Sequence, residues 1–237
     1  MNQAIFRKAG QAWALRTRVE HEAAQRFSRL ARSIPRFDPE SPIPALLRSA
    51  ADDERRHAVL CAELAAAYGE TARDAGIDVS IAPRGLSARD AVLYEMVAAC
   101  CITETESVAT VTTLLAGRLE ARVEKVLHEI ARDEVAHGRM GWAHLAREAS
   151  LRDVGFLSRW VAAMLAGSVD GAFFSEPDPP QEPDDLLRHG IFPPSRKRAV
   201  FMETLEEVVF PGLEKFGIDT RPARFWLAER RGRSHAG

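Results

Sequence analysis

Apolar residues recur along most of this chain at positions i, i+3, i+4 and i+7, which is the spacing of one face of an α-helix. The strict alternation that is typical of a strand is nearly absent. The pattern predicts four long helices and two shorter ones, over residues 11–34, 44–69, 88–119, 122–150, 153–169 and 195–209. The stretch "PRFDPESPIP" should end the first helix, and Pro211 with Gly212 should end the last. The fold class is therefore predicted to be all-α.

Connection lengths indicate how these helices are arranged. The second and third helices are joined by a longer, turn-rich segment, which is consistent with a crossover or with a connection across one end of a bundle. The other links are short enough for antiparallel neighbours. Residues 1–150 are predicted to form a four-helix bundle, and residues 151–237 a helical extension that packs on it. We expect the extension to cover the bundle or to form a homodimer contact, and the closing of a substrate pocket stays open as an alternative.

One short motif occurs twice, on two different predicted helices. The stretches "DERRH", which begins at Asp53, and "DEVAH", which begins at Asp133, both read D-E-x-x-H. Residues three positions apart lie on the same face of a helix, so the glutamate and histidine of each motif can bind one metal ion or two adjacent ions. These candidate ligands are Glu54, His57, Glu134 and His137.

A four-helix di-metal site also needs one inward glutamate from each of the other two helices. In the first helix Glu20 lies on the apolar face, whereas Glu22 lies among arginines on the polar face. In the third helix Glu104 lies on the apolar face, and Glu106, which stays open as an alternative, lies beside threonines. The predicted metal ligands and catalytic residues are Glu20, Glu54, His57, Glu104, Glu134 and His137.

Four carboxylates and two imidazoles on inward faces suit a particular chemistry. Buried carboxylates need compensating charge, and two divalent cations would supply it. Imidazole with carboxylate favours iron or manganese over structural zinc, and six ligands for two ions leave room for O₂. Asp53 and Asp133 are each expected to hold the second ring nitrogen of the histidine in the opposite motif, with Arg56 neutralising both carboxylates.

Four segments carry a resemblance to a known superfamily. "EHEAAQRFSRLA", "DDERRHAVLCAELAAAYG", "CCITETESV" and "IARDEVAHGRMGWAHLA" resemble the ferritin-like superfamily of non-haem di-iron carboxylate proteins, over about residues 11–150. The resemblance implies a ferritin-like four-helix bundle with the six residues above as iron ligands. The first motif is also similar to the D/E-E-x-R-H motif of bacterial multicomponent monooxygenases, but Ala136 replaces the arginine in the second motif.

Other branches of the superfamily fit less well. Ribonucleotide reductase subunits carry a radical tyrosine one turn after the first motif, where this chain has Cys61. Rubrerythrins add a cysteine-rich domain and an extra inward glutamate on the third helix, and neither is found here. We therefore expect an oxidase or oxygenase that uses two iron ions, or a manganese/iron pair, and O₂ to oxidise a small organic substrate. A ferroxidase or rubrerythrin-like peroxidase is the alternative, and a binding protein with an inactive site is a third.

Composition adds constraints on partners and location. Thirty-two basic and 34 acidic side chains give a formal charge of −2, so there is no general case for binding nucleic acid or an anionic membrane. No apolar run reaches the roughly 20 residues of a membrane span, and no signal peptide or cysteine framework is visible. We expect a cytoplasmic protein with a frayed basic tail, "AERRGRSHAG". Without a flavin or nicotinamide motif, the electrons would come from a ferredoxin or a reductase.

Overall fold

A computed structural model describes residues 3–72, 78–169, 171–179 and 183–234 of the chain. Within these ranges the regular structure is helical and no strand occurs, which confirms the all-α class. The helices of the first part are α1 (Gln3–Ser33), α2 (Ile43–Ala67), α3 (Ala88–Met96), α4 (Glu104–Leu115) and α5 (Ala121–Leu151). Those of the second part are α6 (Val161–Ser168), α7 (Pro183–Leu187), α8 (Pro194–Thr204), α9 (Phe210–Glu214) and α10 (Arg221–Ser234). Single turns of 3₁₀-helix lie at Ile34–Arg36 and Gly155–Arg159.

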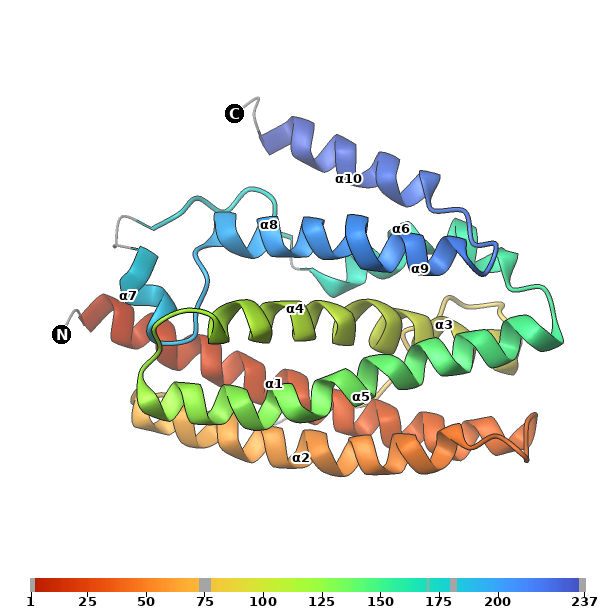
Figure 1. Ribbon diagram of the computed structural model, residues 1–237, viewed down its shortest axis with the longest axis horizontal. Helices are drawn as coiled ribbons and strands as arrows, with labels where there is room; N and C mark the ends of the chain where they lie inside the picture. The colour runs from red at the N-terminus through yellow and green to blue at the C-terminus, as the bar shows by residue number, and fades with distance from the viewer. Residues whose placement is uncertain (1–2, 73–77, 170, 180–182, 235–237) are drawn as a thin grey trace.

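The first five helices form a bundle of four rods (Figure 1). Helices α1 and α2 make an antiparallel hairpin and pack against each other along their lengths. Helix α5 packs on both α2 and α4, and α3 and α4 together make the fourth rod. Helix α2 ends at one end of the bundle and α3 begins at the other, which agrees with a crossover, one of the two arrangements that the long connection allowed. The two D-E-x-x-H motifs therefore lie on adjacent helices, α2 and α5.

The fourth rod is not a uniform α-helix. A π-helical segment, Val97–Thr103, joins α3 to α4 and ends immediately before Glu104. Helix α5 comes very close to this segment at Gly141, where an added Cβ would lie 2.4 Å from the Cβ of Cys100. Because only a residue without a side chain fits there, Gly141 sets the spacing between α5 and the rod that carries Glu104. Such π segments are frequent at functional sites.

The C-terminal helices pack on the side of the bundle formed by α3 and the π-helical segment (Figure 1). One continuous apolar cluster contains residues from both parts of the chain: Leu93, Val97, Ile102, Leu145, Val161, Leu165, Phe201, Phe210 and Leu227 are among them. Burial of this apolar surface is the main force that holds the extension in place. Helix α8 also contacts α4.

The structure differs from the expected boundaries near both ends of the chain and at Pro211. Helix α1 begins at Gln3, since Ile5 and Ala9 continue its buried stripe toward the N-terminus. The helix that begins at Pro194 does not end at Pro211, because a second π-helical segment, Leu205–Val209, precedes it. The altered hydrogen bonding of a π turn removes the clash that a proline ring makes inside a regular α-helix. The basic tail is helical through Ser234, and residues 235–237 lie outside the described residues.

None of the described helices is both long and apolar enough to cross a lipid bilayer.

Candidate metal centre

The six predicted ligands come together in the middle of the bundle. They form two groups, each with ligand atoms within 4.8 Å of one another. One group contains Glu20, Glu54, His57 and Glu134, and the other contains Glu54, Glu104, Glu134 and His137. Two ligands on opposite sides of one ion would be separated by about 4.2 Å, twice a typical metal–ligand distance. Each group therefore has nearly the dimensions of one metal site, and Glu54 and Glu134 belong to both.

All six side chains are buried despite their polarity. Their exposed fractions run from 0% for Glu54 and His57 to 6% for Glu104. Glu22, which the pattern had placed on the polar face, and Glu106, which it had left open, belong to neither group. Glu22 forms an exposed ion pair with Arg18, and Glu106 accepts a hydrogen bond from Thr110. Within the described residues, no further group of three or more such side chains lies close enough to hold an ion.

The two histidines face the carboxylates through the same ring atom. Nδ1 of His57 lies 3.4 Å from Oε2 of Glu54, and Nδ1 of His137 lies 2.9 Å from Oε1 of the same glutamate. The ring centroids of the two imidazoles are 6.1 Å apart. Glu54 thus lies between two imidazoles that belong to different groups.

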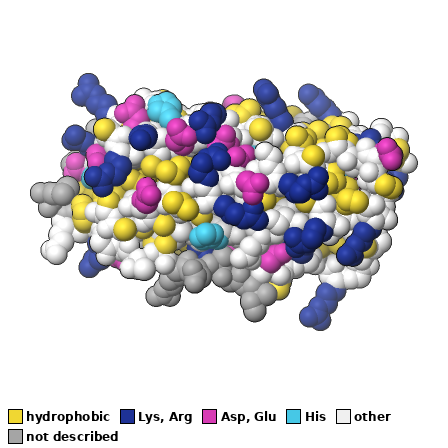
Figure 2. All heavy atoms as spheres, turned by 90° about the horizontal axis from the view of Figure 1, so that it is seen from below, with side chains coloured by type: hydrophobic (Ala, Val, Ile, Leu, Met, Phe, Trp, Pro, Cys, Tyr) yellow, Lys and Arg dark blue, Asp and Glu magenta, His cyan; other side chains and the backbone are white. Residues whose placement is uncertain are grey.

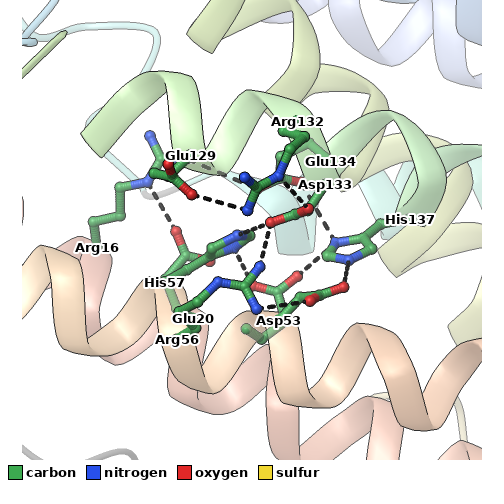
Figure 3. Close-up of polar contacts among 11 residues, drawn as sticks. Arg16, Glu20, Asp53, Arg56, His57, Glu129, Arg132, Asp133, Glu134 and His137 are labelled. Atoms are coloured by element: carbon green, nitrogen blue, oxygen red, sulfur yellow. Dashed lines mark hydrogen bonds and ion pairs between the residues drawn. The ribbon is translucent and has the colours of Figure 1, made fainter. Parts of the chain in front are cut away.

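The opposite ring atoms contact the aspartates of the two motifs (Figure 3). Nε2 of His57 lies 3.1 Å from Oδ2 of Asp133, and Nε2 of His137 lies 3.4 Å from Oδ2 of Asp53. Each aspartate therefore contacts the histidine of the other motif. If Nε2 carries the proton and donates it to the aspartate, the lone pair of Nδ1 points toward the glutamates and can bind a metal ion.

Arg56 links the two aspartates. Its guanidinium donates one hydrogen bond to Asp53 at 2.9 Å and another to Asp133 at 2.5 Å (Figure 3). The neighbouring Arg55 points away and pairs with Asp52, whose side chain is 78% exposed. Figure 2, seen from the side of α2, shows basic and acidic side chains interspersed over this face of the protein. The Arg56 network thus connects the buried histidines to a charged surface.

A cation that was not predicted from the sequence lies at the other side of the centre. Arg16 lies one turn before Glu20 on α1, and its Nε donates a 2.8 Å hydrogen bond to Oε1 of that glutamate (Figure 3). The i,i+4 spacing of Arg16 and Glu20 is the signal that could have revealed this pair. Burial disfavours the charge of Glu20, but Arg16, together with a hydrogen bond involving Glu54 and the charge of His57, outweighs burial and lowers the pKa of this carboxyl group.

Burial outweighs the compensating charges at the other carboxyl groups of the centre, although Arg16 lies 4.0 Å from Oε1 of Glu134. Burial raises the pKa of Glu54 well above its ordinary value, and the charges of Glu20 and Glu104 raise it further. Burial and Glu104 likewise raise the pKa of Glu134. Three buried polar atoms of the centre, Oε1 of Glu54, Oε2 of Glu134 and Nδ1 of His137, have no hydrogen-bond partner among the described residues, although Oε1 of Glu54 lies 2.9 Å from Nδ1 of His137. Buried polar atoms are normally satisfied, and a cation bound among these atoms would satisfy them.

Comparisons of the chain with models of protein families, with characterised proteins and with solved structures give no significant match.

Proposed function

We propose that this protein is a non-haem di-iron oxidase or oxygenase of the ferritin-like type, which uses O₂ to oxidise a small organic substrate. The observation that supports the proposal most strongly is that two buried ligand groups share Glu54 and Glu134. Two-metal sites hold their ions about 3.5–4 Å apart, a distance that a carboxylate can bridge. In this proposal Glu54 and Glu134, which belong to both groups, would help to hold both ions.

The residues fit a pair of divalent metal ions in number, charge and donor type. Four ionised carboxylates carry four negative charges, which two divalent ions would neutralise. The donors are carboxylate oxygens and imidazole nitrogens, which suit iron and manganese. The described cysteines Cys61, Cys100 and Cys101 are buried free thiols, and none belongs to a ligand group. A manganese/iron pair is compatible with the same ligands.

Each side chain has a separate task in this proposal. His57 and His137 would hold the metal ions through Nδ1, while Asp53 and Asp133 would keep the protons on Nε2 and fix the orientation of the rings. Arg56 balances the charge of the two aspartates. When bound, the metal pair would supply the electron transfer to O₂ that amino-acid side chains cannot perform. An external donor such as a ferredoxin or a reductase would return the centre to its reduced state.

Anaerobic titration with Fe(II), followed by exposure to O₂, tests the proposal. The protein should bind two Fe(II) per chain and consume O₂ faster than the same concentration of free Fe(II). The double variant Glu54→Ala/His137→Ala should lose both properties. Binding of fewer than one Fe(II), or O₂ consumption equal to that of free iron, would contradict the proposal.

The alternative, a ferroxidase or a rubrerythrin-like peroxidase, uses the same ligands and differs in its products. A ferroxidase would turn over many Fe(II) per chain and accumulate ferric mineral, and a peroxidase would react faster with hydrogen peroxide than with O₂. An oxidase or oxygenase should instead stop after one oxidation per metal pair until a reductant and an organic substrate are added. Stopped-flow measurements with each oxidant separate these outcomes.

A further inference from the structure

A hollow of about 300 Å³ lies on the surface of the hairpin formed by α1 and α2, and we call it the hairpin hollow. This volume is at the lower end of the range for small-molecule sites. One face of each helix borders the hollow, because residues at i, i+3, i+4 and i+7 lie on the same side of a helix. The lining residues are Ser28, Ala31 and Arg32 from α1, and Arg48, Ala51, Asp52 and Arg55 from α2. None of these seven residues belongs to the ligand groups of the metal centre.

Small residues form the floor of the hairpin hollow, and arginines form its walls. Ala31 and Ala51 are only 3% and 1% exposed, so they lie at its base. Arg32 on α1 and both arginines on α2 are exposed. A group that entered the hollow would therefore meet guanidinium groups from both helices.

The hairpin hollow carries an excess of positive charge. Its one carboxylate, Asp52, is paired with Arg55. Arg32 and Arg48 form no hydrogen bond or ion pair with another residue in the described part of the chain. Figure 2 shows that basic side chains predominate toward the right of this face, at the end where α1 and α2 are joined. Three guanidinium groups and one carboxylate leave a net charge of +2 in the hollow.

Ser28 adds a hydrogen-bond donor to these cations. Its Oγ accepts a 2.8 Å hydrogen bond from Arg55, and it donates to no other residue in the described ranges. A helical serine often donates its proton to the carbonyl four residues earlier, as Ser33 does to Arg29. Because Ser28 makes no such bond, its hydroxyl proton is available to an anion in the hollow.

We propose that the hairpin hollow binds the phosphate group of a small, soluble phosphate monoester. A phosphate group carries nearly two negative charges at pH 7 and has three strong acceptor oxygens, which match a net charge of +2 and donors that approach from two helices. A carboxylate has one charge and two oxygens in a plane, so one arginine can satisfy it. The site is separate from the metal centre, and the proposal does not depend on bound metal.

Calorimetric titration of the metal-free protein at low ionic strength tests the proposal. Glycerol 3-phosphate should bind with a Kd below about 1 mM, and glycerol should not bind. Arg32→Gln and Arg48→Gln should each weaken the binding by about 10-fold or more, as expected for loss of a charge-assisted hydrogen bond. Both side chains are exposed and unpaired, so the Tm of each variant should equal that of the wild type, which separates loss of binding from loss of folding.

Arg18→Gln is the matched control, because Arg18 is also an exposed arginine of α1 but pairs with Glu22 and does not line the hollow. Its affinity for glycerol 3-phosphate should equal that of the wild type. An equal loss in Arg18→Gln, unchanged binding in both Arg32→Gln and Arg48→Gln, or no binding by the wild type would overturn the proposal.

Two further ligands test the chemical class and its source. Glycerate, which carries a carboxylate in place of the phosphate, should bind at least about 10-fold more weakly, and equal affinity would overturn the assignment to phosphate. Vesicles that contain phosphatidic acid present the same phosphate group on a membrane. Binding to these vesicles that depends on Arg32 and Arg48, without binding of glycerol 3-phosphate, would overturn the assignment to a soluble ligand.

Discussion

Oδ2 of Asp133 on α5 lies 3.1 Å from Nε2 of His57 on α2, so the residue that precedes one proposed ligand holds the histidine of the other motif. Asp53 and His137 make the reciprocal contact at 3.4 Å. Because Arg56 bonds both aspartates, the two motifs form one hydrogen-bonded unit across the α2–α5 interface. The duplicated D-E-x-x-H sequence therefore encodes both the proposed ligands and the residues that orient them.

Removing the aspartates or the arginine that orient the two histidines should weaken metal binding without removing a proposed ligand. We expect Asp133→Asn and Arg56→Gln to lower the affinity for Co(II) by about 10- to 100-fold, because the imidazoles lose the groups that fix their tautomer and orientation. Calorimetric titration measures the effect. Arg55→Gln is the control, since Arg55 is the next residue on the same helix but contacts Asp52 and Ser28 instead. An equal loss of Co(II) affinity in Arg55→Gln would contradict this explanation, because it would show that removing any nearby positive charge weakens metal binding.

Shared and unshared ligands should differ in the number of ions that they affect. Glu54 belongs to both groups and Glu104 to one. Glu104→Gln should therefore weaken one of two Co(II) binding events, whereas Glu54→Gln should weaken both. Metal content after dialysis measures this, with the exposed Glu63 of the same helix as the control in Glu63→Gln. If Glu54→Gln keeps one ion at wild-type affinity, Glu54 does not bridge.

Gly141→Ala should disturb the centre from a distance. The new Cβ would lie 2.4 Å from Cβ and 2.9 Å from the carbonyl carbon of Cys100, so α5 and the π-helical segment must move apart. We expect a loss of about 1–3 kcal/mol in the free energy of unfolding, together with weaker Co(II) binding, since Glu104 directly follows that segment. Gly138→Ala is the control, because its Cβ would meet no atom closer than 3.8 Å. Urea unfolding of both variants tests the difference.

His144 should make the protein sensitive to acid. It is fully buried, and neither ring nitrogen has a hydrogen-bond partner among the described residues. Burial lowers its pKa to about 4, with Glu148 and Asp38 opposing the shift and Arg89 and Arg152 adding to it. In the unfolded chain its pKa would be about 6.5.

As the pH falls, His144 therefore takes up a proton in the unfolded chain before it does so in the folded protein. This uptake favours the unfolded state, so folding stability decreases between about pH 6.5 and 4. His144 should account for a loss of about 2 kcal/mol between pH 7.5 and pH 5. In His144→Leu the difference between urea unfolding free energies at these two pH values should shrink by that amount. His128→Gln, which changes a 65% exposed histidine on the same helix, should leave the difference unchanged. An unchanged difference in His144→Leu would contradict the prediction.

Much of the bundle could be predicted because helical periodicity is a local property of the sequence. The choice of Glu20 over Glu22 and of Glu104 over Glu106 followed from which side chains share a face with apolar neighbours. The two π-helical segments could not be predicted, because no proline or glycine marks Val97–Thr103 and their stability comes from packing. Pro211 was expected to end its helix because the sequence gives no sign of the π-helical segment, Leu205–Val209, that precedes it.

Residues that act through long-range contacts were harder to predict. The cross-pairing of Asp53 and Asp133 could be proposed because a repeated motif implies symmetry between α2 and α5. The contact of Arg16 with Ser107 joins residues far apart in the sequence and depends on how α1 lies against α4. Periodicity gives the face of each helix but not the spacing between helices, so the contact of Arg16 with α4 became visible only in three dimensions.

The most direct test of the account is anomalous X-ray diffraction from crystals of the protein loaded anaerobically with Fe(II), recorded at the iron absorption edge. The account predicts two anomalous peaks per chain, one beside Nδ1 of His57 and the other beside Nδ1 of His137. Both peaks should lie within bonding distance of Glu54 and Glu134. No peak at the centre, or a single ion that leaves one of the histidines without a metal, would contradict it.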